Sequence, residues 1–355
     1  MADQDDAFAQ ALKIQAGACE ALGSSFSARL LSLAAEAVVT PGALRGLFAP
    51  WADAGVRAQI TDAVPLRFLG ALHERVLSGQ APELAAAYPR PGAPGDPDRA
   101  WRAAAALIEA GGDQIAEFMQ HEPQTNETLR SISLLGGYLT IAQATGLPMR
   151  LFELGASAGL NQNWDAFRFD LGEAGAWGAA DARVKMATAW GGAAPPLGAP
   201  VTVVSRAACD RKPADVADPA ARRRLKAYVW ADQFERLARL EAAIGVALDA
   251  GTKVEAADAA DWTAARVATA PGTVSVLFHS VFWQYMPPAT QAALEAMIAQ
   301  IGAEATADAP FAWLRLEPPP TTMINMEVRL TMWPGGEERL LGRSHPHGAW
   351  VEWLG

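Results

Sequence analysis

A short run of small residues in the middle of the chain has the composition of a ligand-binding turn. Residues 151–161 read Leu-Phe-Glu-Leu-Gly-Ala-Ser-Ala-Gly-Leu-Asn, which predicts a strand, a turn and the start of a helix. Gly155, Ser157 and Gly159 allow a ligand close to the backbone, and a helix start presents amide N–H groups to it. We expect a cradle for a nucleotide or a carboxylate, in which Glu153 accepts from an ammonium or hydroxyl group. A tight turn without a ligand is the plain alternative.

The same run also matches the Gly-x-Ser-x-Gly nucleophile elbow of α/β-hydrolases. Ser157 would then be the nucleophile, and the order of serine, acid and histidine can be filled downstream. The acids available are Asp258 and Asp261, and the histidines are His279, His345 and His347. A hydrolase elbow follows several strands, whereas the sequence before this run has a helical pattern. A dinucleotide fingerprint, Gly-x-Gly-x-x-Gly, fits only at its first glycine.

The composition excludes several classes of protein. The chain has 355 residues, with 29 Lys and Arg against 39 Asp and Glu, and a net charge of −10. This length predicts about two domains, and the acidic balance argues against a nucleic-acid-binding face. Two cysteines without metal-ligand spacing predict neither a disulfide framework nor a metal site. The first six residues are acidic and no long apolar run follows, so we expect a cytoplasmic protein without a membrane segment.

The spacing of apolar residues changes near residue 149. Before it, spacings of three and four, as in Leu66, Leu69 and Leu72, predict helices, one of them capped by Asp96. After it, short apolar runs alternate with helical stretches, as in an α/β sheet. We expect a helical cap domain over 1–120 and an α/β domain over 121–355. Seven strands are predicted, at 149–154, 201–205, 253–256, 274–279, 312–316, 326–333 and 339–353, the last of them broken around residues 345–346. The last two form a hairpin across residues 334–336. Helices are predicted at 218–244 and 288–301, and an extra hairpin within 167–190.

The run from Glu153 to Gly159 resembles motif I of class I S-adenosylmethionine-dependent methyltransferases, Glu/Asp-x-Gly-x-Gly-x-Gly, with Ser157 in place of the central glycine. More closely, the chain resembles an uncharacterised bacterial family of methyltransferase-like proteins, the domain of unknown function 2332 family. The resemblance is carried by residues 124–127 with Arg130, 153–161, 209–210, 229–233, 279–285, 313–318, 332–337 and 346–348. It implies a Rossmann-like, seven-stranded methyltransferase sheet.

The methyltransferase pattern implies a set of cofactor-binding positions in this sequence. It places Glu153, Gly155, Ser157 and Gly159 near the methionine part of S-adenosylmethionine. The acid for the ribose hydroxyls is Asp210 or, if a hairpin is inserted before it, Asp170. The adenine amino group would meet Asp258, and Asn126 and Asn161 complete the set; Thr125 or Asn126 also caps the next helix.

Candidates for catalysis follow the fourth predicted strand. His279 could accept a proton from an acceptor hydroxyl or amine, although a histidine on an apolar strand is often structural. Tyr285, with Trp283, would line an aromatic pocket. We expect a methyltransferase acting on a small-molecule acceptor. The alternatives are an esterase using Ser157 and a non-catalytic S-adenosylmethionine-binding protein; the sequence leaves the acceptor and the oligomeric state open.

Overall fold

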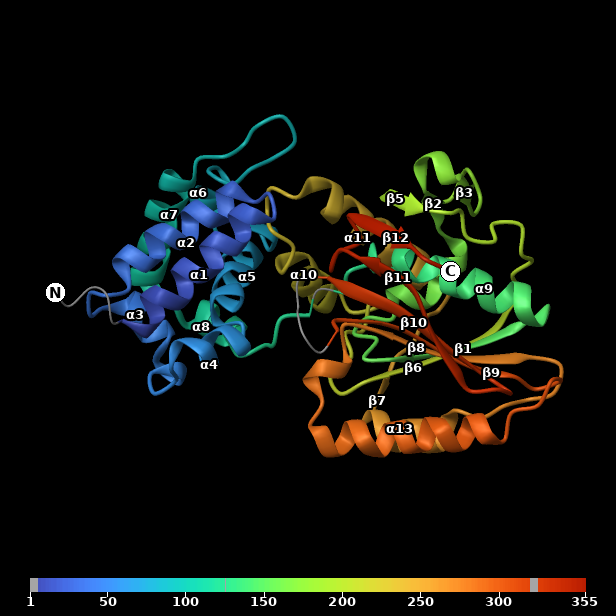
Figure 1. The fold of residues 1–355 in the computed structure, drawn as a ribbon. Coiled ribbons are helices and arrows are strands. Elements are labelled where there is room, and N and C mark those ends of the chain that lie inside the picture. The colour runs from blue at the N-terminus through green and yellow to red at the C-terminus, as the bar shows by residue number, and fades with distance from the viewer. Residues whose placement is uncertain (1–5, 125, 320–324) are drawn as a thin grey trace. The chain divides into compact units, whose positions relative to one another are not determined.

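The computed structural model describes residues 6–124, 126–319 and 325–355 (Figure 1). The chain forms two compact units, one made of Met1–Thr125 and Asp218–Ala238 and the other of Asn126–Ala217 and Arg239–Gly355. The expectation of an α/β protein with a helical N-terminal part is confirmed. The segment 218–238, which the sequence analysis placed with the sheet, is part of the helical unit. None of the helices in the described residues has the length and apolar content needed to cross a bilayer.

The helical unit is built from short helices around an apolar core. Asp6 caps α1 and Asp96 caps α7, where Asp96 accepts from Arg99 N at 2.9 Å, as expected for Asp96. The core includes Phe68, Tyr88 and Tyr228. The helices are α1 (Ala7–Ala21), α2 (Ser25–Ala37), α3 (Ala43–Leu47), α4 (Val56–Thr61), α5 (Val64–Leu77), α6 (Pro82–Ala85), α7 (Pro97–Gly111), α8 (Asp113–Met119) and α10 (Pro219–Ala227).

The helix predicted over 218–244 is wrong in its middle. It is broken into α10 and α11 (Phe234–Asp249). Asp232, in the break, accepts from Ser24 Oγ at 2.5 Å and from Phe26 N at 3.2 Å, and the carbonyl oxygens of Ala227 and Val229 lie 3.3 and 3.0 Å from His73 Nδ1. These groups bond to α2 and α5 instead of continuing a helix. Tertiary bonding therefore overrides the helical spacing of the segment.

The second unit contains a mixed sheet of nine strands in the order β5-β12-β11-β10-β9-β8-β1-β6-β7. Its five strands from β7 to β9 are parallel, and β10, β11 and β12 follow as an antiparallel meander. The strands are β1 (Met149–Leu154), β5 (Ala189–Gly192), β6 (Val203–Asp210), β7 (Glu255–Ala256), β8 (Val274–Ser280), β9 (Phe311–Glu317), β10 (Met326–Trp333), β11 (Glu337–Ser344) and β12 (Trp350–Trp353).

Nine strands replace the seven that were predicted, for two reasons. The predicted last strand is interrupted after Ser344, at the expected break, and the two parts are separate strands, β11 and β12, which pair with each other. Strand β5 was not predicted, and it pairs in parallel with β12. The extra hairpin expected within 167–190 is a separate small sheet of β2 (Arg168–Asp170), β3 (Ala176–Trp177) and β4 (Lys185–Ala187). The hairpin predicted at residues 334–336 is confirmed by the antiparallel pairing of β10 with β11.

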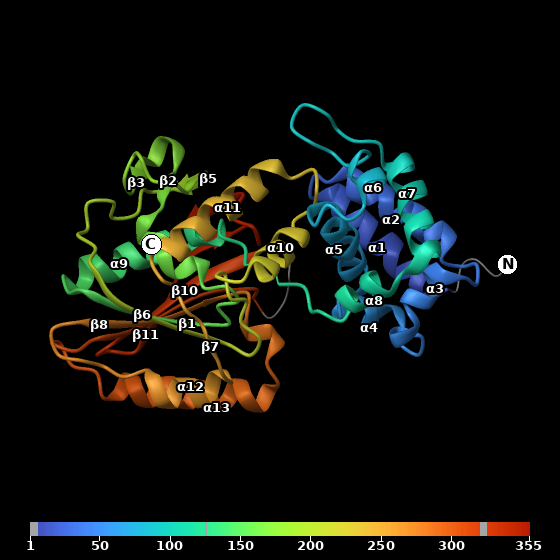
Figure 2. The ribbon, with the colours of Figure 1, turned by 180° about the vertical axis from the view of Figure 1, so that it is seen from behind.

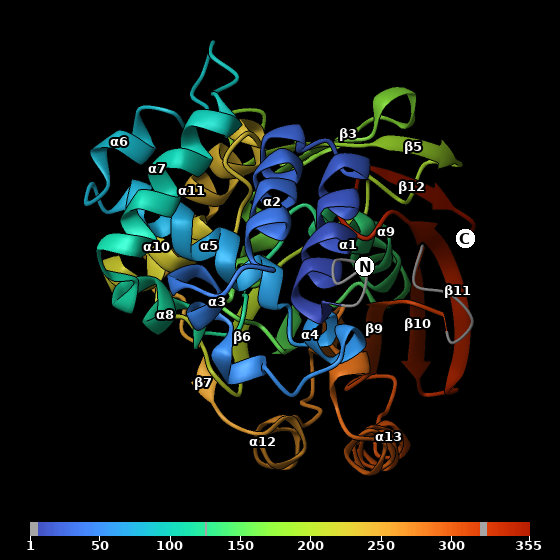
Figure 3. The same cartoon turned by 90° about the vertical axis from the view of Figure 1, so that its left-hand side faces the viewer.

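Helices cover both faces of the large sheet (Figures 2 and 3). Helix α9 (Arg130–Thr145) packs on β9, β10 and β11 on one face, whereas α12 (Ala259–Arg266) and α13 (Pro288–Ala303) lie on the other. Close packing of α9 depends on two glycines: a Cβ on Gly136 would overlap the Trp353 ring, and one on Gly137 would overlap Leu314. The parallel strands are thus buried on both sides, as parallel sheets require.

Substitution of Gly136 tests this packing. We expect Gly136→Ala to lower the free energy of unfolding by about 1–3 kcal/mol, because the buried Trp353 ring must move. Gly17→Ala is the matched control, since Gly17 lies in α1 with open space around a Cβ and should be neutral or stabilising by roughly 0.5–1 kcal/mol. Urea unfolding followed by circular dichroism measures both; equal effects of the two changes would contradict the packing.

Candidate functional site

The carboxyl ends of the parallel strands bring the predicted site residues to one edge of the sheet. Strand β1 pairs with β6 on one side and with β8 on the other, and the chain order of the strands reverses there. By order of appearance the five parallel strands run 3-2-1-4-5, the beginning of the order found in dinucleotide-binding folds. Ligands of such open α/β sheets bind at this reversal, outside the carboxyl ends.

Glu153 lies at this point, near the end of β1. Its neighbours in register are Ala208 on β6 and Phe278 on β8, and its side chain is 3% exposed. Burial, and in second place the charge of Asp210, raises the pKa of the Glu153 carboxyl well above its usual range. The Oε2 atom is buried and has no hydrogen-bond partner among the described residues. Such an orphaned carboxyl oxygen is costly and is a place where a ligand can donate.

The turn after β1 is held by the end of β6. The backbone N–H of Ser157 donates to Asp210 Oδ2 at 2.9 Å, and Ala214 N donates to the Ser157 carbonyl at 3.1 Å. Asp210 Oδ1 accepts from Lys212 N at 2.9 Å. Ser157 has a φ of 54°, which is uncommon for a residue other than glycine, and its buried Oγ has no hydrogen-bond partner in the part of the chain that the structure describes. Asp210, predicted to meet ribose, therefore also positions the turn.

Gly155 is a position where only glycine fits. Its φ is 63°, and a Cβ there would overlap the ring of Phe282. Phe282 lies in the loop after β8, so its side chain joins that loop to the turn after β1 by direct packing. Gly159, with a φ of 70°, is similarly crowded by Val254 and Thr252. Nothing in the spacing of Phe282 in the sequence marks this contact in advance.

The segment before α9 reaches the far end of the turn. Asn126 Oδ1 accepts from Leu160 N at 3.1 Å. Asn161 Nδ2 donates to the Glu127 carbonyl at 3.4 Å, and Asn161 Oδ1 accepts from Ser131 Oγ at 2.7 Å. The N-cap residue of α9 is Leu129, so the expectation that Asn126 caps this helix is wrong; the other candidate, Thr125, lies outside the described residues. Both asparagines thus bond the segment before α9 to the end of the turn, and we call these bonded residues the wall of the turn.

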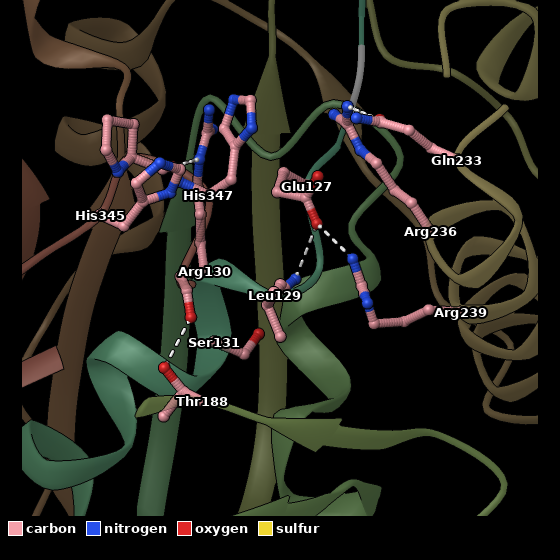
Figure 4. Close-up of polar contacts among 12 residues, drawn as sticks. Glu127, Leu129, Arg130, Ser131, Thr188, Gln233, Arg236, Arg239, His345 and His347 are labelled. Atoms are coloured by element: carbon pink, nitrogen blue, oxygen red, sulfur yellow. Dashed lines mark hydrogen bonds and ion pairs between the residues drawn. The ribbon is translucent and has the colours of Figure 1, made fainter. Parts of the chain in front are cut away.

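Figure 4 shows that two further segments meet beside this wall. The buried Glu127 carboxylate accepts from Leu129 N at 3.1 Å and pairs with Arg239 at 3.4 Å. Arg130 Nε donates to the Pro346 carbonyl at 3.1 Å, and the flanking His345 and His347 rings contact each other edge to face with centroids 5.7 Å apart. These contacts join residues 126–130 to residues 345–347.

The loop between β11 and β12 is fixed from a second side. The Thr188 hydroxyl donates to the Gly348 carbonyl at 2.8 Å, and His347 N donates to His345 Nδ1 at 3.0 Å. Gly348 has a φ of 74°, and a Cβ there would collide with the Leu129 carbonyl. This explains the glycine of the Pro-His-Gly run, which was noted in the sequence without a role.

His279 and Tyr285 occupy different environments. The ring of His279 is fully buried, with Nδ1 at 2.6 Å from Glu317 Oε1 and Nε2 at 3.1 Å from Trp313 Nε1. Both ring nitrogens are therefore engaged by protein groups. Tyr285 is 71% exposed in a 3-10 turn. The structure brings His279 near the end of β8 but gives its nitrogens no direct access to a substrate.

The structure separates the two acids proposed for ribose and places the acid proposed for adenine beside one of them. Asp258 is exposed and caps α12, accepting from Ala260 N at 2.9 Å. It follows β7, in which Ala256 is the register partner of Asp210 on β6. Asp170 lies on β2 of the small sheet and accepts from Gly172 N. Of the two ribose candidates, Asp210 is the one bonded to the turn.

Comparison with known proteins places the chain in a family. The family model described as "Uncharacterized protein conserved in bacteria (DUF2332)" matches residues 9–353. The chain belongs to this family. None of the curated proteins and none of the solved structures compared with the chain matches it. The DUF2332 match covers both units, so the helical residues and the sheet belong to one family architecture. The described residues contain no cluster of three or more His, Cys, Asp or Glu side chains suited to a metal ion.

The contact between Gly155 and Phe282 gives a testable coupling. Gly155→Ala should cost about 2–5 kcal/mol in free energy of unfolding, because it adds backbone strain and a clash with the ring. In the double variant with Phe282→Ala the clash is absent, so the double-mutant cycle should show about 1–3 kcal/mol of coupling. Gly172→Ala, at a φ of 60° with open space around a Cβ, should cost only the strain, about 1–2 kcal/mol. Additive effects of the two site changes would refute the contact.

The burial of Glu153 predicts a pH-dependent stability. Above about pH 4.3 an unfolded glutamate loses its proton, whereas folded Glu153, whose pKa is raised, keeps it. The free energy of unfolding therefore falls as pH rises toward the folded pKa. Glu153→Gln has no such proton, so its stability relative to the wild type should be greater at about pH 8 than at about pH 5. Urea unfolding at both pH values measures this. Glu337→Gln, an exposed control, should show no such trend, and a flat difference for Glu153→Gln would argue against a neutral buried carboxyl.

Proposed function

We propose that the sheet unit binds S-adenosylmethionine and transfers its methyl group to a small-molecule acceptor. The observation that carries the proposal is the buried Glu153 carboxyl, whose Oε2 lacks a partner among the described residues at the strand-order reversal, next to a glycine-containing turn. A ligand ammonium or hydroxyl group donating to this oxygen would satisfy it. The 3-2-1-4-5 order of the parallel strands supports a nucleotide-binding sheet of the Rossmann-like kind.

The residues of the turn are compatible with the cofactor that the resemblance implies. The buried Glu153 Oε2 and Ser157 Oγ atoms lack partners within the described chain, and Gly155 and Gly159 supply the positive φ of the turn, with Phe282 and Val254 packed where their Cβ atoms would lie. Glu153 would hold the amino group of the methionine part, Asp210 the ribose hydroxyls and Asp258 the adenine amino group. The sulfonium of the bound cofactor supplies an electrophilic methyl carbon. Phe282 packs on Gly155, so this ring would shift to admit a ligand there.

The esterase alternative has weaker support from the geometry. Ser157 has the positive φ that strains a nucleophile elbow, but its Oγ has no hydrogen-bonded histidine among the described residues. His279 bonds instead to Glu317 and Trp313. A serine nucleophile needs a base within hydrogen-bond reach, so the arrangement favours cofactor binding over hydrolysis.

Calorimetric titration with S-adenosylhomocysteine and S-adenosylmethionine tests the proposal, with NAD as a control ligand. We expect micromolar binding of the sulfur nucleotides. The ligand ammonium would bind Glu153 as the carboxylate, with release of the proton that the buried carboxyl keeps in the free protein, so Glu153→Gln should weaken binding about tenfold or more because this charge-assisted hydrogen bond is lost. Glu337→Gln should bind as the wild type does. Undiminished binding by Glu153→Gln would contradict the placement of the site.

A parallel assay with p-nitrophenyl acetate separates the alternatives. Ester hydrolysis that disappears in Ser157→Ala, without nucleotide binding, would establish the esterase instead. Nucleotide binding that Ser157→Ala retains, with no hydrolysis, supports the proposed site. Binding without methyl transfer to any cellular small molecule would indicate a non-catalytic binding protein.

A further inference from the structure

Glu317, at the carboxyl end of β9, is the centre of a bonded cluster that the sequence analysis did not identify. Its Oε1 atom lies 2.6 Å from His279 Nδ1 and accepts from Phe282 N at 2.9 Å, and its Oε2 atom lies 3.2 Å from the same amide. The side chain is 13% exposed. Glu317 thus joins the end of β9 to the end of β8 and to the loop that follows β8.

The protonation of His279 follows from its two partners. The indole N–H of Trp313 is a donor only, so His279 Nε2, 3.1 Å away, must be an acceptor without a proton. The ring is then neutral, and its single proton lies on Nδ1 and points at Glu317. Both donors to Glu317, the imidazole and the Phe282 amide, are neutral groups. The carboxylate is therefore oriented by its donors without being neutralised by them, and Oε2 keeps the capacity to accept from another donor.

The backbone at this place is strained in a way that keeps Glu317 beside the turn. Val281 has a φ of 52°, an outlier for a β-branched residue. Its N–H donates to the Leu316 carbonyl at 2.8 Å, so the end of β9 holds the strained residue. The next residue, Phe282, bonds through its amide to Glu317 and places its ring on Gly155. Strain of this kind persists where the surrounding structure imposes it, often at functional sites.

We propose that Glu317 is the catalytic base of the methyl transfer and that His279, held by Trp313, is its positioning residue. This inference rests on the proposed function. The acceptor would be an amine or a hydroxyl compound: its lone pair forms the bond to the methyl carbon while the carbon–sulfur bonding pair remains on sulfur, and its N–H or O–H proton passes to Glu317 Oε2. The role expected of His279 thereby moves to the carboxylate that His279 orients.

The test uses binding and needs no known acceptor. In sinefungin a carbon bearing an amino group replaces the sulfonium and its methyl group, so its ammonium marks the position of the transferred methyl. A carboxylate facing this position should make the wild-type protein bind sinefungin about tenfold tighter than S-adenosylhomocysteine. In Glu317→Gln the ratio should fall toward one, with the affinity for S-adenosylhomocysteine retained. Calorimetry of both ligands gives the ratio directly.

Glu327→Gln is the matched control. Glu327 is the register partner of Glu317 on β10 and is 12% exposed, but it pairs with Arg329; its substitution should leave the ratio unchanged. His279→Asn, which keeps an amide N–H near the Nδ1 position, should keep most of the preference, whereas His279→Leu should reduce it. If Glu317→Gln does not fold, Glu317→Asp replaces it in the test. This change keeps the charge on a side chain one methylene shorter, so the ratio of the two affinities should be intermediate.

The outcomes distinguish the two proposals. A wild-type protein that binds neither nucleotide refutes the proposed function and this inference with it. Binding of both nucleotides with the same ratio in wild type and Glu317→Gln refutes the inference alone. Equal loss of both affinities in Glu317→Gln would show that Glu317 only supports the loop.

Discussion

The parallel pairing of β1 with β6 on one side and β8 on the other determines which residues lie together at the candidate site. Because the three strands run in the same direction, their carboxyl ends present Leu154, Asp210 and Ser280 at one edge. The connections from β1 and β8 then diverge, since β6 and β9 lie on opposite sides. Loops that diverge in this way bring residues far apart in the chain together at one edge, as in other open α/β sheets.

The turn at this edge is stable because its neighbours compensate for unfavourable features. Ser157 and Gly155 both have positive φ, and the Asp210 carboxylate accepts a hydrogen bond from the Ser157 backbone N–H. The Phe282 ring covers the bare backbone. Glu153 has no comparable compensation in the described residues, and its burial shifts the carboxyl toward the neutral form. The strained backbone of the turn is thus stabilised by contacts within the protein, whereas the buried Glu153 carboxyl group is left without a hydrogen-bond partner for its Oε2 atom among the described residues.

The sequence predicted the parts of this arrangement that depend on local patterns. The strand before Gly155, the hairpin at Pro334 and the cap at Asp96 follow from apolar runs and turn residues, and all three are present. The break in the helix around Asp232 was missed because its cause lies in Ser24 and His73, more than a hundred residues away. Local propensity contains no information on such partners.

The same limit explains the misses at the edge of the sheet and in the site. Strand β5 contains only Ala189, Trp190 and two glycines, and it is a strand because β12 pairs with it. Glu317 directly precedes Pro318 at the end of an apolar run, a pattern that predicts a strand end. Its bonds to His279 and Phe282 arise from the adjacency of β8 and β9, which no spacing in the sequence specifies. The sequence therefore indicated which residues end each strand, but it did not indicate which strands pair or which side chains bond to each other.

The composition of the helical unit from two stretches has a consequence for synthesis of the chain. The core contains Tyr228 and Trp230 as well as residues of the first 119, so the ribosome must add more than a hundred further residues before that core can close. At roughly 5–20 residues per second this delay lasts on the order of 5–25 seconds. During that interval the α5 surface that later packs against Tyr228, at Gly70, remains uncovered. The apolar face of α5 is thus completed only after the sheet unit has begun to emerge.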